Sequence, residues 1–226
     1  MAFSWGEIAP PFLLSLKTIF TCSIFLLIIG TPLAYLLSKR WRGRWIVDAI
    51  VTLPLIFPPI AVGFFLLLLL GKNGMIGSFL AKLNISIIFE FSGLVIAGVV
   101  AGLPLMVKPL QAAIEVFPKS IVEASYVSGH GKIGTFMYVI LPGVKYSLLI
   151  ALIVSIARAL GEVGITLMLG GNIVGKTDTV SLAIYNAVFD GDHALAMALS
   201  MILVVTSLLF FAFLNFLQNR EKRKLG

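Results

Sequence analysis

EASYVSGHGKIGTFMYVILP, residues 123–142, is the stretch around which the rest of the chain is organised. It is the one sizeable polar interval between long apolar segments that carries an ordered series of helix breakers and charges. Pro118 suits the first turn of a helix, where its missing N–H has no partner, and Gly129 suits the left-handed residue that ends one. We therefore expect a helix from about Pro118 to Ser128, a second from about Lys132 to Pro142, and a helix–turn–helix elbow over about residues 115–143.

The composition is that of an integral membrane protein. Of the 226 residues, 59% are hydrophobic and 12% charged, which leaves little material outside the lipid and predicts a single membrane domain. The net charge of +7 does not indicate nucleic-acid binding, because the charges lie at the ends of apolar segments. Cys22 is the single cysteine, so no intrachain disulfide is possible.

Five apolar segments are long enough to cross the hydrocarbon of a bilayer, which takes about 20 residues. We expect an all-α membrane protein with about five transmembrane helices in one domain, residues 1–226. The connector at 71–90 predicts a short interfacial helix, and a sixth, re-entrant segment there remains open. The five predicted spans are approximately Phe12–Leu37, Ile46–Leu70, Phe91–Val107, Tyr146–Leu169 and Ala194–Leu217.

Basic residues predict the orientation. Twelve of the 17 Lys and Arg residues lie in the first connector, in the third connector and in the C-terminal tail. The positive-inside rule therefore places the N-terminus outside, and the elbow and C-terminus in the cytoplasm. Trp41 and Trp45 read as interfacial anchors, and the basic tail after Gln218 as a cluster that binds lipid headgroups.

Prolines interrupt the second predicted span. Pro54, Pro58 and Pro59 remove backbone donors, so this helix should be kinked or locally unwound, and Pro104 repeats the device more weakly in the third span. Freed backbone groups cannot face lipid, so the break should face protein or a water-filled path. Kinks used only for packing are the alternative.

A charged pair lies inside the fourth predicted span. Arg158 and Glu162 are four residues apart, which would put both on one helix face. A charge at that depth costs about 2.5–3.5 kcal/mol, so both should face the interior and each other. Two interpretations remain open: a buried structural ion pair, or a pair that lines the transport path and senses an anion.

Residues 170–177, GGNIVGKT, fit the pattern G-x-x-x-x-G-K-T of phosphate-binding loops. That loop needs a parallel strand before it and an α/β domain around it, and here an apolar helix precedes it. We expect a glycine-rich outer loop. His130 and His193 are predicted on opposite sides of the membrane, so we expect no shared metal site. No Ser–His–Asp set, metal-spaced cluster or carboxylate pair supports catalysis, so we expect no catalytic residues and no cofactor in this chain.

The elbow resembles the cytoplasmic loop that marks the membrane subunits of bacterial ABC importers. Ser125 stands where that family commonly has Ala, and Val139 where it commonly has Ile. The resemblance implies that the elbow docks into a groove on a separate ATPase subunit; an ordinary amphipathic connector is the alternative. The residues given this coupling role are Glu123, Ala124, Ser125, Gly129, Leu141 and Pro142.

Further blocks, in order from about Thr18 to Val205, resemble the permeases of molybdate ABC importers within the sulfate and molybdate group, which have the type I importer fold. This resemblance implies a homodimer in the bacterial cytoplasmic (inner) membrane that imports molybdate or tungstate. It also implies two ATPase subunits that use ATP and Mg, and an external (periplasmic) oxyanion-binding protein. The blocks are LPLIFPPIAVGFFLLLLLG (53–71), GLPLMVKPLQAAIE (102–115), RALGEVG (158–164) and GGNIVGKTDTVSLAIYNAV (170–188).

Two other functions remain open at this point. Sulfate or thiosulfate is the nearest rival substrate, and an ATP-independent anion carrier or channel is the rival of another class. The path of the importer should bind its anion weakly, because a tight site would trap it. The hydroxyls and backbone groups expected to line the path or gate belong to Thr52, Pro58, Ser155 and Thr166.

Overall fold

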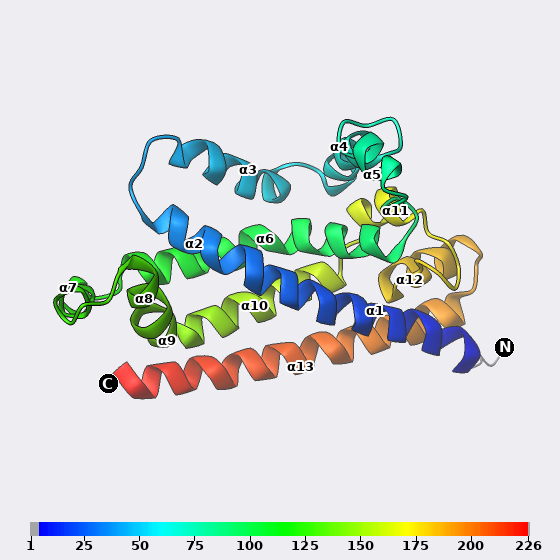
Figure 1. Cartoon of the computed structure of the whole chain (residues 1–226). Coiled ribbons are helices and arrows are strands. Elements are labelled where there is room, and N and C mark those ends of the chain that lie inside the picture. The colour runs from blue at the N-terminus through cyan, green and yellow to red at the C-terminus, as the bar shows by residue number, and fades with distance from the viewer. Residues whose placement is uncertain (1–4, 226) are drawn as a thin grey trace.

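The computed structural model describes residues 5–225, with side chains as far as Phe216, and all regular structure in that range is helical (Figure 1). The all-α prediction is therefore confirmed. The basic side chains of the tail lie outside the described part. The helices are α1 (Trp5–Phe25), a π-helical turn η1 (Leu26–Gly30), α2 (Thr31–Ser38), α3 (Arg44–Ile56), α4 (Pro59–Leu70), α5 (Gly77–Lys82), α6 (Phe91–Glu115), α7 (Lys119–Val127), α8 (Lys132–Thr135), a second π-helical turn η2 (Phe136–Ile140), α9 (Leu141–Gly143), α10 (Lys145–Leu160), α11 (Gly164–Gly170), α12 (Val180–Phe189) and α13 (His193–Leu225).

Helix α6 is the centre of the molecule. It packs against α1, α2, α10 and α11, and buried residues recur along its whole length. Glycines allow two of these neighbours to come close: a Cβ at Gly98 would lie 2.7 Å from the Cys22 sulfur, and one at Gly102 would lie 2.9 Å from the Ser155 carbonyl oxygen. Small residues permit such close backbone approach between membrane helices. Gly98 and Gly102 thus let α1 and α10 pack closely against α6.

Among the described residues, three helical stretches are long and apolar enough to cross a membrane: Trp5–Ser38, Phe91–Glu115 and His193–Phe216. A fourth is possible if Lys132–Gly143 and Lys145–Leu160, which are bent by 77° relative to each other, form one broken span. Only 6% of the most apolar window of α13 is buried, against 67% for α6, so α13 lies on the outside of the bundle.

The second predicted span is two helices and not one continuous helix over 46–70. The helix α3 ends at Ile56 and α4 begins at Pro59, with Phe57 and Pro58 in extended conformations between them. The predicted interruption is therefore present. Its physical cause is the pair Pro58-Pro59, which supplies no N–H groups to continue the ladder of α3. By contrast α6 runs on past Val107 to Glu115 with Pro104 and Pro109 inside it.

The fourth predicted span, 146–169, is also interrupted, which the sequence analysis did not foresee. Helix α10 ends at Leu160 and α11 begins at Gly164. Gly161 is the C-cap of α10, and Glu162 uses its side chain to accept the N–H of Ile165 at the start of α11. A side chain that satisfies free N–H groups favours starting a new helix over continuing the old one.

The elements separate into two ends of the bundle (Figure 1). The described N-terminus, α5, α11 and α12 gather at one end, which we call the outer end. The end of α2, the elbow helices α7 and α8, and the C-terminal part of α13 gather at the other, the elbow end. The short helix predicted in the connector at 71–90 is present as α5, which has only six residues.

Candidate functional site

The first limb of the elbow forms as the sequence predicts. Pro118 is the N-cap of α7, and Ser128 is its C-cap. Gly129 has φ +87°, and its N–H donates to the Tyr126 carbonyl oxygen at 3.0 Å. The His130 N–H donates to the Ser125 carbonyl oxygen at 3.1 Å. These two bonds form a Schellman motif, which ends a helix with a left-handed residue and satisfies its last carbonyl groups.

The predicted coupling residues of this limb divide into two kinds. Glu123 and Ala124 are exposed on α7. Ser125 is buried, and its hydroxyl lies 3.0 Å from that of the fully buried Thr135 in the second limb. A Cβ on Gly129 would meet nothing within 4 Å. Ser125 thus joins the two limbs, whereas Glu123, Ala124 and the surface beside Gly129 are open to a partner.

The second limb is anchored in the core. Phe136 and Ile140 of η2 are buried, and the Phe136 ring centroid lies 4.2 Å from that of Tyr35. Leu141 packs against the same core cluster, whereas Pro142 is exposed. The predicted helix from Lys132 to Pro142 is thus a short α-helical turn followed by a π-helical one. The elbow is an extension of the bundle and not a loose connector.

The elbow also carries exposed apolar side chains that the sequence analysis did not identify as functional. Val127 is 90% exposed and Ile133 is 79% exposed, although both flank a polar turn. Exposed apolar patches mark sites that interact with another protein or with a membrane, and the polar residues around these two side chains favour a protein partner. The sequence feature that could have indicated this surface is the presence of two large apolar residues, Val127 and Ile133, within the polar stretch. We define the docking patch as Ile121, Glu123, Ala124, Val127, Ile133 and Tyr138.

The two interrupted helices meet at their breaks. A Cβ on Gly164, the first residue of α11, would lie 2.9 Å from the Ile60 nitrogen and 2.9 Å from the Pro59 Cβ at the start of α4. A Cβ on Gly63 would lie 2.9 Å from the Ile165 Cα. The contact between α4 and α11 therefore has no room for larger side chains, and the two helices start side by side.

Arg158 and Glu162 lie at this junction and form an ion pair, with Nη1 and Oε2 2.6 Å apart. The expectation that one helix face holds both is wrong, because α10 ends before Glu162. The Glu162 side chain is 1% exposed and accepts the Ile165 N–H at 2.7 Å, whereas the Arg158 side chain is 31% exposed. This geometry favours a structural role for Glu162 and leaves only Arg158 partly open.

The predicted path residues occupy different elements. Ser155 of α10 is fully buried and donates its hydroxyl proton to the Ala151 carbonyl oxygen at 2.7 Å. Thr52 of α3 donates to the Asp48 carbonyl oxygen at 2.7 Å, Thr166 of α11 is buried, and Pro58 lies in the break. No hydrogen bond joins any two of these four residues within the described part of the chain. Two of the hydroxyl protons are thus already used by their own helices.

The glycine-rich loop at residues 170–177 is closed on itself. Thr177 accepts the Ile173 N–H at 2.8 Å and donates to the Gly170 carbonyl oxygen at 2.7 Å. The Gly175 N–H donates to the Asp178 carboxylate at 2.8 Å. Backbone and hydroxyl groups that a phosphate-binding loop would offer to a nucleotide are engaged inside the loop. Between residues 5 and 225 the structure shows no group of three or more acidic, His or Cys residues placed to hold a metal ion.

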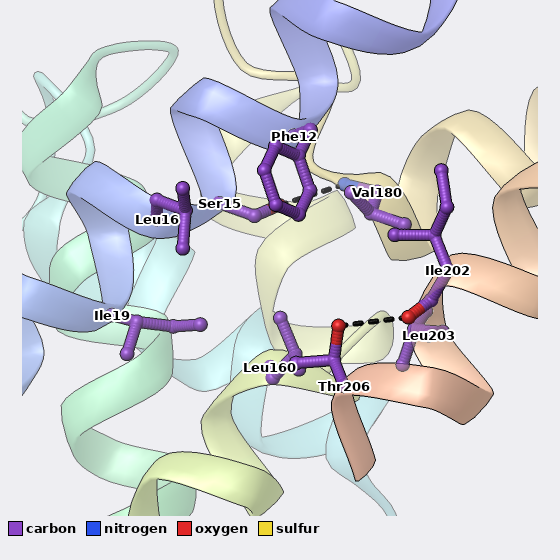
Figure 2. A pocket seen from close by; sticks show the side chains of 9 residues that line it. All are labelled: Phe12, Ser15, Leu16, Ile19, Leu160, Val180, Ile202, Leu203 and Thr206. Atoms are coloured by element: carbon purple, nitrogen blue, oxygen red, sulfur yellow. Dashed lines mark hydrogen bonds between the residues drawn. The ribbon is translucent and has the colours of Figure 1, made fainter. Parts of the chain in front are cut away.

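A small apolar niche lies between α1 and α13 (Figure 2). Phe12, Leu16 and Ile19 point into it from α1, and Ile202 and Leu203 from α13. The Ser15 hydroxyl at its edge accepts the Val180 N–H at 2.9 Å, so that polar group is occupied. The Thr206 hydroxyl, which also lines the niche, donates to the Ile202 carbonyl oxygen at 2.7 Å, so the remaining lining is apolar.

Comparison with known proteins gives the family. Residues 26–223 match the model of the binding-protein-dependent transport system inner membrane component family. The chain is 37% identical over 185 residues to the molybdenum transport system permease protein ModB of Azotobacter vinelandii, covering 81% of this chain and 82% of ModB. It is 30% identical over 220 residues to the sulfate transport system permease protein CysT of Salmonella typhimurium, covering 97% of this chain and 79% of CysT.

A solved structure shares the fold. The chain superposes on a chain of the inward-facing MetNI methionine ABC transporter with a TM-score of 0.74 at 18% identity, covering 96% of this chain and 99% of that one. The arrangement of helices is thus that of type I ABC importer permeases. Neither the family description nor the names of these relatives indicates an enzymatic activity. The chain belongs to the binding-protein-dependent transport system inner membrane component family, the permease subunits of ABC importers, and its relatives include molybdate and sulfate permeases.

Proposed function

We propose that this permease subunit imports molybdate or tungstate, that it works as a homodimer, and that two copies of a separate ATPase drive it through the elbow. An external oxyanion-binding protein delivers the substrate. The chain itself holds no cofactor, and ATP and Mg are used on the ATPase. The membrane is the bacterial cytoplasmic (inner) membrane, with the elbow and the C-terminus in the cytoplasm. Exposed basic residues at the elbow end, Arg40, Arg42 and Lys119, support this orientation.

The geometry of the elbow is the observation that carries the proposal. Glu123, Ala124 and Val127 present an exposed, partly apolar face, while Phe136 and Ile140 fix the base of the elbow in the core. Because the base of the elbow is fixed in the core, a partner that binds the docking patch can displace the bundle without unfolding the elbow. This is what a transporter driven by a separate ATPase needs, and an ATP-independent carrier or channel would have no use for it.

The path is proposed to run along the junction of the broken helices, where Thr52, Pro58, Ser155 and Thr166 are the candidate lining or gate residues. The buried Ser155 hydroxyl donates to its own helix, and Arg158 is neutralised by Glu162. Such a path offers an anion few free donors. Weak binding suits transport, because an anion held tightly at the midpoint would not leave.

The choice of substrate rests on the relatives. The named molybdenum permease ModB is 37% identical to this chain, and the named sulfate permease CysT is 30% identical but covers more of it. Molybdate, tungstate and sulfate are all tetrahedral dianions, so the geometry of the permease alone separates them poorly. Sulfate or thiosulfate import is therefore the second candidate.

The test is ATP-driven uptake of labelled molybdate into vesicles that hold this subunit with its ATPase and external binding protein. We expect uptake that requires ATP, is inhibited by tungstate and is insensitive to excess sulfate. Strong inhibition by sulfate would move the chain to the sulfate branch. Uptake that does not depend on ATP would reject the ATPase coupling and favour a carrier.

A further inference from the structure

Helix α3 is a half-helix with a non-helical joint at each end. It begins after Gly43, whose φ is +86°, and ends before the extended Phe57. Val51 is its only buried residue, and most of its large apolar side chains face outward. A short helix with two joints and little buried surface can change its angle more easily than the continuous helices around it.

One narrow stripe of α3 holds it to α6. Its members recur at helical spacing on one face: Arg44, Val47, Asp48 and Val51. Arg44 Nη2 lies 2.8 Å from Glu115 Oε1, and Lys108 pairs with Asp48. The Glu115 oxygen also accepts the Gln111 amide at 3.0 Å. The residues of α6 that face this stripe thus supply the opposite charges, and the partners are 71 and 60 positions apart in the sequence.

These two ion pairs can open more easily than the contact that holds α4, the other half of the broken span. Helix α4 meets α11 through glycines with no space to spare, a contact that cannot loosen without leaving voids. The four charged side chains on α3 and α6 are each about one-third exposed. Ion pairs that water can reach add little stability and are easily replaced by hydration, so they can open and re-form.

The position of the pairs links them to the elbow. Glu115 is the last residue of α6, and α7 begins at Lys119. Phe117 lies between these two helices and packs against Gly143 at the end of the second limb. A Cβ added to Gly143 would lie 2.4 Å from the Phe117 ring. Any displacement of the elbow therefore acts first on the end of α6 that carries Glu115.

We propose that the ion pairs Arg44–Glu115 and Lys108–Asp48 form a releasable latch that transmits movement of the elbow to α3, the half of the broken span at the elbow end. The four residues are positioning residues for transport: they set whether α3 lies against α6 or swings away from it. The inference rests on the proposed function, since it assumes that an ATPase moves the elbow.

The first experiment measures labelled molybdate uptake and ATP hydrolysis together in vesicles containing the complete transporter. Glu115→Arg places a like charge beside Arg44 and should lower the molybdate imported per ATP hydrolysed at least fivefold. The exchanged pair Arg44→Glu/Glu115→Arg should return this ratio to within twofold of the unaltered protein. An unchanged ratio in Glu115→Arg, or no recovery in the exchanged pair, would overturn the latch.

The control is the ion pair Lys176–Glu90 at the outer end of α6, whose two side chains are similarly exposed. Glu90→Lys also places like charges together but does not touch α3. Its ratio of import to hydrolysis should match that of the unaltered protein. A loss equal to that of Glu115→Arg would show that any broken ion pair on α6 has this effect, and would reject a specific latch.

A second measurement does not depend on transport. In a Cys22→Ser background, Val51→Cys places a thiol on the buried face of α3, at a position where the native side chain is 3% exposed. Its labelling by a water-soluble maleimide should be at least fivefold faster when Glu115→Arg is added and should slow again in the exchanged pair. Equal labelling rates reject the latch. Lack of ATP-driven uptake by the unaltered protein rejects the proposed function instead.

Discussion

The elbow and the glycine-rich loop at residues 170–177 lie at opposite ends of the bundle and use similar residues in different ways (Figure 1). Each contains a glycine with positive φ and open space around its Cα, Gly129 in one and Gly175 in the other. In the glycine-rich loop, Thr177 and Asp178 turn inward and bond to the loop's own backbone. In the elbow, Val127 and Glu123 point outward and bond to nothing that the structure records. Hydrogen-bonding groups that stabilise the fold are already paired within it, whereas exposed groups are available to a partner.

The largest expected effect comes from placing a charge in the docking patch. Val127→Asp should lower the affinity for the partner ATPase about thirtyfold or more, roughly 2 kcal/mol, because docking would bury an unpaired carboxylate. ATP-driven uptake should fall accordingly while the amount of inserted protein stays the same. The matched control is Val174→Asp in the glycine-rich loop, a position that is 79% exposed, against 90% for Val127. An equal loss of ATPase binding by both variants would show that the elbow and the glycine-rich loop do not differ as docking surfaces.

Charge reversal at Glu123 tests the same face without changing an apolar contact. Glu123→Lys should abolish ATP-driven uptake and leave membrane insertion intact, since the side chain is exposed and makes no bond inside the described chain. Co-purification of the ATPase with the variant measures the effect directly. Full uptake by Glu123→Lys would remove this residue from the docking patch.

The two glycines allow a comparison at fixed backbone strain. Gly129→Val and Gly175→Val should each cost about 1–2 kcal/mol in stability, because a β-branched residue is disfavoured at positive φ. Only Gly129→Val should stop uptake, since Gly129, unlike Gly175, is one of the predicted coupling residues. Gly129→Asn tolerates the left-handed conformation and should retain most activity. Thermal unfolding and uptake, measured on all three variants, separate strain from docking.

The ion pair at the junction extends the comparison to the middle of the bundle. Arg158→Ala leaves the buried carboxylate of Glu162 without its partner and should reduce stability by about 3 kcal/mol or more. Glu162→Ala leaves the partly exposed Arg158 uncompensated and removes the acceptor for the Ile165 N–H. The double variant should yield more folded protein than either single one. Additive losses in a membrane expression assay would contradict the pairing.

The smallest effect is expected at Asp178. Burial raises the pKa of its carboxyl above the ordinary value, although backbone N–H groups oppose the shift. The folded chain thus holds this proton more tightly than the unfolded chain. The contribution of Asp178 to stability therefore falls as pH rises from about 4 through the raised pKa. Asp178→Asn keeps an acceptor for Gly175, so its stability should depend less on pH over that window. An identical pH profile by thermal unfolding would exclude this role.

Much of the elbow could be predicted from sequence because its signals are local. Pro118 and Gly129 define the ends of α7 through backbone geometry alone, and the structure places both as expected. Pro58 and Pro59 likewise predicted the helix break after Ile56. The break after Leu160 could not be foreseen in the same way. It depends on the local bonds of Glu162 to Ile165 and Arg158 and on the close fit of Gly164 against the start of α4, a tertiary contact that residue type alone does not reveal.

The same limit applies to the candidate path. Thr52 and Ser155 looked like available hydroxyls, yet both donate to carbonyl groups four residues earlier in their own helices. Serine and threonine commonly do this in membrane helices, so residue type alone does not identify a free donor. Val127 and Ile133 were overlooked for the opposite reason, since their exposure becomes visible only once the elbow is folded.

The paired breaks also bear on how the chain enters the membrane. Helix α4 has 12 residues and α11 has seven, so they are about 18 Å and 11 Å long, well short of the roughly 30 Å of hydrocarbon. Neither can span the lipid alone, and each carries a break whose free backbone groups cannot face lipid. Because Gly63 and Gly164 bring the two helices together, each one shields the other's break. We therefore expect the predicted second and fourth spans to insert and fold together.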